Sequence, residues 1–375
     1  MTGSAEARRG VVVVYSDPGR GFAHDHERAT REGIARRLAA LEGFDFAGEF
    51  DPGARYPGPV YLVPSDTLVG VEAAALGVRG ERVLFGGVVP RAFMATKAIT
   101  HPLVGPDAAA PPGWSPAFGR RVRGAVLSGF TAFSRADARR AGERLLEHGP
   151  VRVKPVRATG GRGQVVASDA AALEAALGAV EAADLSEHGL VLEEDLAGVT
   201  TYSVGQVRVA DIIATYYGTQ RLTPDNAGEA VYGGSELLVA RGGFEALAGL
   251  GLPEEARLAV EQARIYDAAA TRCFAGMFAS RRNYDVARGL DAEGRWRSGV
   301  LEQSWRIGGA SGAEVAALEA FRAEPALRAV RAATVELYGQ DVPPPPAHAT
   351  VYFRGVDKKD GPMTKYVMVE SHGDP

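Results

Sequence analysis

A lysine at the end of a strand-like run is followed closely by a glycine-rich turn. Lys154 lies in VRVKPV, and the turn after it contains Gly160, Gly161, Arg162, Gly163 and Gln164. Glycines permit a turn in which several backbone N–H groups converge on one anion, and a lysine ammonium supplies a compact positive charge for phosphate. The segment lacks the terminal GKS or GKT of a Walker loop. It predicts either a phosphate-binding loop or an ordinary glycine-rich hairpin.

A second candidate is the segment LVLEEDLAG, where a buried strand runs into adjacent carboxylates. In one interpretation this is a hinge: its backbone and the Glu193 carboxylate bind the edge of an adenine, with Glu194 and Leu196 beside it. In the other interpretation the acids simply face solvent at the end of a strand.

A third candidate is a pair of acids on two strand-like runs that the turn DAEGR separates. Asp285 lies in NYDV and Glu302 in VLEQSWR, so a hairpin brings the two carboxylates side by side. Carboxylates held together repel each other, and a hard divalent cation such as Mg²⁺ relieves this repulsion. Ser304 and Arg306 follow at steps of two, so they share a strand face with Glu302. The pattern predicts either a magnesium site with an anion-binding arginine or an acid–arginine pair on an exposed hairpin.

The elements that must position these residues fall into three parts. Strand-like runs at 11–16, 59–63 and 82–89 alternate with helical segments, which predicts an α/β domain with a parallel sheet over 1–92. Hairpins and amphipathic helices then predict an α+β region over 93–340. After a polyproline spacer, residues 341–375 form a tail with two strand-like pieces.

In this order, the lysine with its glycine turn, the acid-ended strand and the Asp…Glu-x-Ser-x-Arg hairpin resemble the ATP-grasp superfamily over about residues 93–325. The resemblance implies an N-terminal Rossmann-like domain followed by a two-subdomain ATP-grasp fold, with subdomains at about 93–195 and 196–340. It also resembles, more closely, a bacterial ATP-grasp family of unknown function.

The resemblance implies roles for individual residues. Lys154 and the glycine turn would contact ATP phosphates, residues 191–196 would hold adenine with Glu193 at its amino group, and Asp285 and Glu302 would ligate Mg²⁺. Lys97, in MATKAIT, is the candidate for an earlier phosphate-binding lysine of the family. One departure is Ser304, which stands where the family usually has an asparagine and which implies a weaker or single-ion site.

The expected activity is that of an ATP- and Mg²⁺-dependent carboxylate–amine or carboxylate–thiol ligase, with Lys154 and Arg306 as its catalytic residues. A small-molecule kinase on the same fold and a nucleotide-binding regulatory protein without turnover are the alternatives. The polar, glycine-rich segment 215–237 is interpreted as a long loop that is either a plain surface loop or the acceptor pocket. The candidates for substrate binding are Arg221 and Asn226 from this segment, together with Arg306.

Composition narrows the remaining choices. Lys and Arg total 42 and Asp and Glu total 46, a net charge of −4 that argues against nucleic-acid binding. Apolar runs stay well below the ~20 residues of a membrane span. A single cysteine is typical of a reducing cytoplasm. The expected partners are therefore small-molecule substrates, with a homodimer as one option for assembly.

Overall fold

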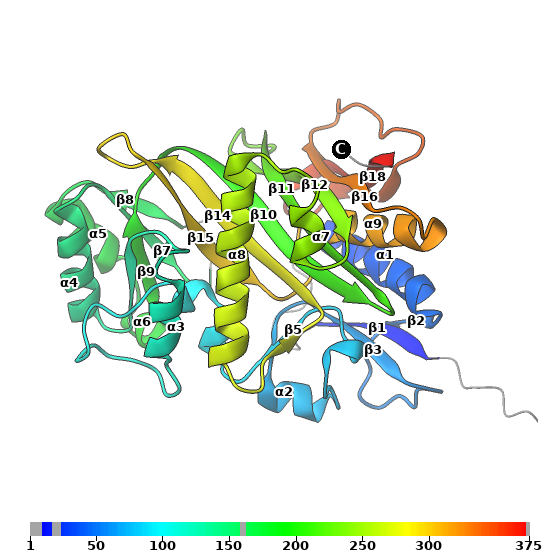
Figure 1. Ribbon diagram of the computed structural model, residues 1–375, viewed down its shortest axis with the longest axis horizontal. Helices are drawn as coiled ribbons and strands as arrows, with labels where there is room; N and C mark the ends of the chain where they lie inside the picture. Colours follow the sequence, from blue (N-terminus) through cyan, green and yellow to red (C-terminus); the bar gives the residue numbers. More distant parts are fainter. Residues whose placement is uncertain (1–9, 17–23, 158–162, 373–375) are drawn as a thin grey trace, which may run out of the picture.

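A long antiparallel sheet runs through the middle of the computed structural model, which describes residues 10–16, 24–157 and 163–372 (Figure 1). Its strand order is β15-β14-β10-β11-β12-β16-β18-β17. The strands are β10 (Ala197–Val209), β11 (Ile212–Pro224), β12 (Ala230–Arg241), β14 (Arg281–Leu290), β15 (Trp296–Ser304), β16 (Ala329–Tyr338), β17 (Thr350–Asp357) and β18 (Gly361–His372). The predicted hairpin with the turn DAEGR is present as β14 and β15.

A smaller four-stranded sheet lies beyond the β15 edge, with the order β6-β9-β7-β8. It consists of β6 (Gly129–Ala132), β7 (Val151–Pro155), β8 (Val165–Ala167) and β9 (Leu190–Glu194). The helices α4 (Arg135–Leu146) and α5 (Ala170–Gly178) pack together and cover one face of it. The apolar positions of α4 recur at helical spacing, so Ala138, Ala141 and Leu145 are all buried against this sheet. The glycine turn therefore joins two strands, β7 and β8, of one small sheet.

The N-terminal part is a parallel sheet in the order β2-β1-β3, and two of its strands lie at the predicted runs 11–16 and 59–63. The third strand, β2, is not among the predicted strands, and the run 82–89 does not join this sheet. Its strands are β1 (Val11–Tyr15), β2 (Asp45–Glu49) and β3 (Val60–Pro64), and α1 (Asp25–Glu42) connects the first two. Val12 and Val14 belong to a hydrophobic core that also includes residues of α1, β11, β18 and α9 (Ser311–Ala323). A further small sheet, β13-β5-β4, pairs β5 (Gly87–Val89) with β13 (Phe278–Ala279) across the predicted boundary near residue 92. The N-terminal part is thus built into the rest of the molecule.

Helix α8 (Glu254–Cys273) crosses one face of the large sheet over β10, β14 and β15 (Figure 1). The remaining short elements are β4 (Leu68–Val69), α2 (Gly70–Ala75), α3 (Pro116–Val122), α6 (Ala182–His188), α7 (Phe244–Ala248) and the 3-10 helices η1 (Glu81–Val83), η2 (Ala92–Ala95) and η3 (Lys97–Ile99). Within the described ranges, no helix has both the length and the apolar character needed to cross a membrane.

Two segments differ from their sequence-based expectations. The loop expected at 215–237 is instead most of the β11–β12 hairpin, whose far end projects into solvent and so tolerates polar residues. Gly234 has φ +135°, and an added Cβ would lie 2.0 Å from the Thr334 carbonyl oxygen, so this strand position requires glycine. The tail strands β17 and β18 extend the large sheet through pairing of β18 with β16.

Candidate functional site

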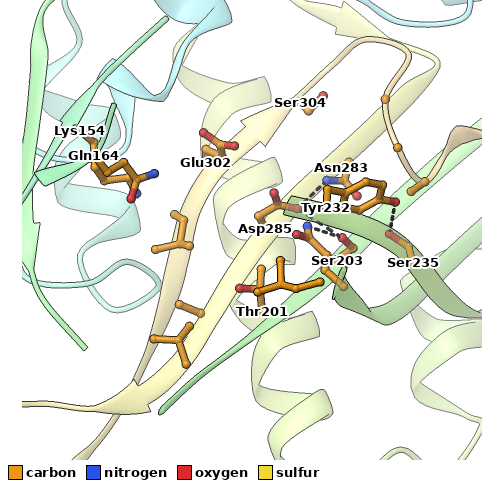
Figure 2. Close-up of a pocket in the computed structure, with 18 of the residues that line it drawn as sticks. Lys154, Gln164, Thr201, Ser203, Tyr232, Ser235, Asn283, Asp285, Glu302 and Ser304 are labelled. Carbon is orange, nitrogen blue, oxygen red and sulfur yellow. Dashed lines mark hydrogen bonds between the residues drawn. The ribbon is translucent and has the colours of Figure 1, made fainter. Parts of the chain in front are cut away.

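A cavity of about 520 Å³ lies between the small sheet and the face of the large one. Its walls come from β7 and β9 on one side and from β10, β11, β12, β14 and β15 on the other. Figure 2 shows Lys154 and Gln164 on the first wall and Asp285, Asn283 and Ser203 grouped on the second, with Glu302 between them. The three sequence candidates therefore meet in one cavity whose volume suits a small-molecule ligand.

One end of this cavity is apolar. Leu127, Leu196 and Ala287 form a small buried cluster against which Leu301 packs, and all four side chains line the cavity. Leu196 is the last residue of the predicted hinge, 191–196, so the hinge contributes an apolar surface here. An aromatic ring placed on this cluster would bury its faces against aliphatic side chains.

The other end carries the predicted acid pair. Asp285 and Glu302 face each other in register across β14 and β15, beside a bulge that inserts Leu301 between Glu302 and the next paired residue. Asp285 Oδ1 accepts hydrogen bonds from Asn283 Nδ2 at 3.0 Å and from Ser203 Oγ at 3.3 Å. Burial and, next, the neighbouring Glu302 carboxylate raise the pKa of Asp285. The site thus holds two acids close together at an energetic cost.

Lys97 lies at this same end. Its Nζ is 2.6 Å from Glu302 Oε2, and its side chain is buried. The ammonium partly neutralises the acid pair, since it pairs with one of the two carboxylates. The structure therefore brings the predicted phosphate-binding lysine to the predicted metal ligands.

Lys154 and Glu193 form a buried ion pair on the small sheet. Lys154 Nζ donates to Glu193 Oε1 at 2.9 Å, and His101 Nε2 lies 2.9 Å from Glu193 Oε2. The two residues are diagonal neighbours on β7 and β9, because Lys154 pairs with Val191. These contacts count against the adenine-binding role expected for Glu193, because both of its carboxylate oxygens already bond to Lys154 and His101. Glu193 positions the lysine.

The charge state of Glu193 gives a testable acid sensitivity. Burial alone would raise its pKa, but Lys154 and then His101 outweigh burial and lower it to about 2, from an ordinary 4.5. A carboxylate with a lowered folded-state pKa stabilises the fold fully above about pH 4.5 and loses that contribution as the pH falls toward 2. We expect Glu193→Gln to cost roughly 3 kcal/mol of unfolding free energy at pH 6 and much less at pH 3. Urea unfolding of both proteins at the two pH values tests this, and an equal difference at both would contradict it.

The structure describes the predicted hinge in full and the glycine-rich turn in part. Gly160, Gly161 and Arg162 lie outside the described residues. Gly163 adopts φ +69°, and Gln164 lines the cavity with its Oε1 3.3 Å from Arg152. Glu194 also lines the cavity and accepts from the Ser128 backbone N–H at 2.8 Å and from Arg297 at 3.1 Å.

Ser304 lies beside a cation that the sequence pattern did not suggest. Arg281 Nη1 donates to Ser304 Oγ at 3.2 Å and also binds the Arg306 carbonyl oxygen. The Arg281 guanidinium is fully buried and pairs with the buried Glu314, at 2.7 Å from Nη2 to Oε1. A guanidinium on the Ser304 hydroxyl disfavours a second cation there, which counts against Ser304 as a metal ligand.

Arg306 lines the cavity at the point where β15 leads toward α9. Its Nη1 donates to the Ile307 carbonyl oxygen at 3.0 Å, and its Nε is 3.5 Å from Asp66 Oδ1. The predicted anion-binding arginine therefore lines the same cavity as the acid pair.

The two substrate candidates on the β11–β12 hairpin lie elsewhere. Asn226 Nδ2 donates to the carbonyl oxygens of Asp360 and Pro362, so it joins this hairpin turn to the turn between β17 and β18. Arg221 is half exposed and lies 3.5 Å from Glu236. Neither side chain lines the cavity described above. The assignment of both residues to an acceptor pocket is wrong because their segment forms paired strands whose turn contacts the tail.

The donors at the acid end fit a magnesium ion that accompanies nucleotide phosphates. Mg²⁺ is usually held by one or two carboxylates together with substrate phosphate oxygens and water, and Asp285 and Glu302 supply two adjacent carboxylates. The raised pKa of Asp285 shows a local excess of negative charge, which Lys97 offsets only in part and which a metal cation would offset further. The residues present therefore fit the magnesium ion that the resemblance to the ATP-grasp superfamily implies.

Comparison with solved structures identifies the fold. The chain is similar to phosphoribosylamine–glycine ligase from Thermotoga maritima, with 15% identity and a TM-score of 0.52 over 97% of this chain and 90% of that one. It is similar to biotin carboxylase from Campylobacter jejuni, with 10% identity and a TM-score of 0.50 over 96% and 87%. For N5-carboxyaminoimidazole synthetase from Staphylococcus aureus the identity is 11% and the TM-score 0.50, over 97% and 94%. These ATP-grasp structures confirm the predicted ATP-grasp fold.

Sequence comparison adds the family. A search of curated proteins gave no match to this chain. One family model, described as a protein of unknown function (DUF3182), matches residues 14–367. Because this match covers almost the whole length, the chain belongs to the DUF3182 family, and it has the ATP-grasp fold.

Proposed function

We propose that the protein is an ATP- and Mg²⁺-dependent ligase that joins a carboxylic acid to an amine or thiol through an acyl phosphate. The observation that carries this proposal is the polarity of the 520 Å³ cavity. Its apolar end, at Leu127, Leu196 and Ala287, suits a purine ring, and its other end, at Asp285, Glu302 and Arg306, suits phosphates with their cation. A nucleotide has this same division between a flat apolar base and a charged tail.

Five residues at the site have a part in the proposed reaction. Lys154 and Lys97 would neutralise phosphate charge, and Asp285 and Glu302 would hold Mg²⁺, which shields the phosphate oxygens when bound. Arg306 would hold the acceptor carboxylate in line with the γ-phosphorus.

The proposed reaction has two steps, phosphoryl transfer to the acid and attack by the nucleophile. A carboxylate oxygen forms a bond to the γ-phosphorus as the bond to ADP breaks, which gives an acyl phosphate. The amine or thiol then bonds to the acyl carbon, inorganic phosphate leaves, and the nucleophile loses its proton.

The direct test measures ADP release with a panel of small acids, with and without amines and thiols. ADP that forms only when acid and nucleophile are both present supports the ligase. ADP that forms with an acceptor alone, together with a stable phosphorylated product, indicates a small-molecule kinase. Nucleotide binding without turnover across the panel would indicate a regulatory nucleotide-binding protein.

Asn283 and Ser304 offer a matched pair of substitutions, because they lie directly opposite each other on β14 and β15. Asn283 Nδ2 orients Asp285, whereas Ser304 Oγ is bound by Arg281. We expect Asn283→Ala to raise the Mg²⁺ concentration for half-maximal ATP binding severalfold and Ser304→Ala to leave it nearly unchanged. A magnesium titration at fixed ATP tests this. A larger shift for Ser304→Ala would return Ser304 to the metal site.

A further inference from the structure

A second cavity, of about 290 Å³, adjoins the nucleotide-sized one. The two share Tyr232, Arg306, Gly308 and Gly309 as lining residues. The other walls of the second cavity come from α1 and from the tail side of the large sheet, β16 and β18. Gly309 makes the junction close-packed, because an added Cβ there would lie 2.5 Å from the Tyr232 ring. A molecule in this second cavity would lie against residues that also line the proposed phosphate end of the first one.

Two guanidinium groups line the second cavity. Arg306 is at the shared end and Arg31 comes from α1, with side chains 30% and 18% exposed. Burial lowers the pKa of Arg31; Glu27 and Asp66 oppose this, whereas Arg306 adds to it. Arg31 lies 3.8 Å from Glu27, and Arg306 lies 3.5 Å from Asp66. Two guanidinium groups that line one cavity favour an anion between them in competition with Glu27 and Asp66, and guanidinium forks match a carboxylate in shape.

The tail side of the cavity presents a buried ammonium. Lys365 Nζ lies 2.8 Å from Glu336 Oε1 and 3.2 Å from His26 Nδ1. His26 Nε2 in turn lies 2.8 Å from Asp360 Oδ2, so this arrangement fixes the lysine firmly. An ammonium has three N–H groups, and these two partners engage two of them. The third can donate to an oxygen of a molecule in the cavity.

Resting on the proposed function, we propose that this second cavity binds the acceptor acid, and that the acid is small and carries a second oxygen-bearing group. One carboxylate lies between Arg31 and Arg306, where it meets the γ-phosphate, and the second oxygen group accepts from Lys365. A volume of 290 Å³ equals that of about ten liquid waters at ~30 Å³ each, so the cavity suits a small acid. Short dicarboxylic and hydroxy acids belong to this class.

Succinate and butyrate are suitable probes, because they have the same chain length and differ in the second carboxylate. We expect calorimetry to show succinate binding at least tenfold more tightly than butyrate to the wild-type protein. Arg31→Gln is expected to weaken succinate binding at least tenfold. The matched control is Arg36→Gln on the same helix, an exposed arginine that pairs with Glu32 and does not line the cavity, and it is expected to have no effect. Lys365→Met is expected to bring succinate close to butyrate.

The inference is overturned if succinate does not bind, if butyrate binds equally well, or if the Arg31 and Arg36 variants behave alike. ADP–Mg²⁺ binding to the same variants is measured separately. If the wild-type protein does not bind ADP–Mg²⁺, this contradicts the proposed ligase function but not the second-cavity proposal. The acid titrations contain no nucleotide and therefore still test the second cavity. The Arg31 comparison also holds if Lys365→Met fails to fold, because Arg31 is on a different element.

Discussion

Replacing Asp285 with asparagine is expected to lower Mg²⁺-dependent turnover at least 100-fold while making the ligand-free protein more stable. The loss of activity follows because a neutral amide replaces one of two carboxylates at the proposed metal position, and single electrostatic groups at such sites contribute about 10²–10³ in rate. The gain in stability follows from the raised pKa of Asp285, since an acid with a raised folded-state pKa destabilises the fold at every pH above it. Activity and stability therefore move in opposite directions.

The measurements are ADP release and the thermal midpoint of the ligand-free protein at pH 7. Glu293→Gln is the matched control, because it removes one carboxylate from the exposed turn of the same β14–β15 hairpin. This control is expected to change neither quantity. A variant at Asp285 that keeps its turnover, or one that melts at a lower temperature than the wild type, would contradict the assignment.

The buried pair of Arg281 and Glu314 is expected to have the largest effect on stability. Both side chains are fully buried, and the Tyr216 hydroxyl also donates to Glu314. Glu314→Gln leaves the arginine charge without its counter-ion, which typically costs about 3–5 kcal/mol of unfolding free energy. Urea unfolding measures this loss, and a cost below about 1 kcal/mol would show that the pair is not held as the structure describes.

The double variant Arg281→Met/Glu314→Leu separates stability from function. Apolar replacements of a buried ion pair often restore or exceed the original stability. Arg281 also binds the carbonyl oxygens of Ser304 and Arg306, and so fixes the chain where it leaves the acid end of the site. We therefore expect the double variant to recover stability but to keep low turnover. Full recovery of both would mean that Arg281 has no positioning role.

The sequence predicted the acid hairpin well because it needs only a period of two and a turn. Asp285 and Glu302 do face each other, and continuing the same step backward from Asp285 would also have found Asn283 and Arg281 on the cavity face. The partners of the Glu193 carboxylate could not be predicted in this way. Its neighbour His101 is 92 positions away in the chain, and only the pairing of β9 with its neighbours sets which side chains surround it.

The β11–β12 hairpin shows a second limit. Its outer half is polar and rich in glycine, a composition typical of loops, yet backbone pairing with β16 and packing of the inner half keep it extended. Tertiary contacts outweigh local composition in such segments. The second cavity could not be predicted from local sequence either, because two of its lining residues, Arg31 and Lys365, are far apart in the chain.

The core that unites β1 with β18 also has a consequence for folding during synthesis. Val12 and Val367 belong to the same buried cluster, together with residues of α9. A chain emerging from the ribosome exposes its first strand long before its last strand exists, and domains normally fold in order from the N-terminus. Here Val12 can complete its core only after the segment that contains Val367 has been synthesised. Contacts between such distant residues slow folding, so the nascent strand β1 keeps apolar surface exposed until β18 has been synthesised.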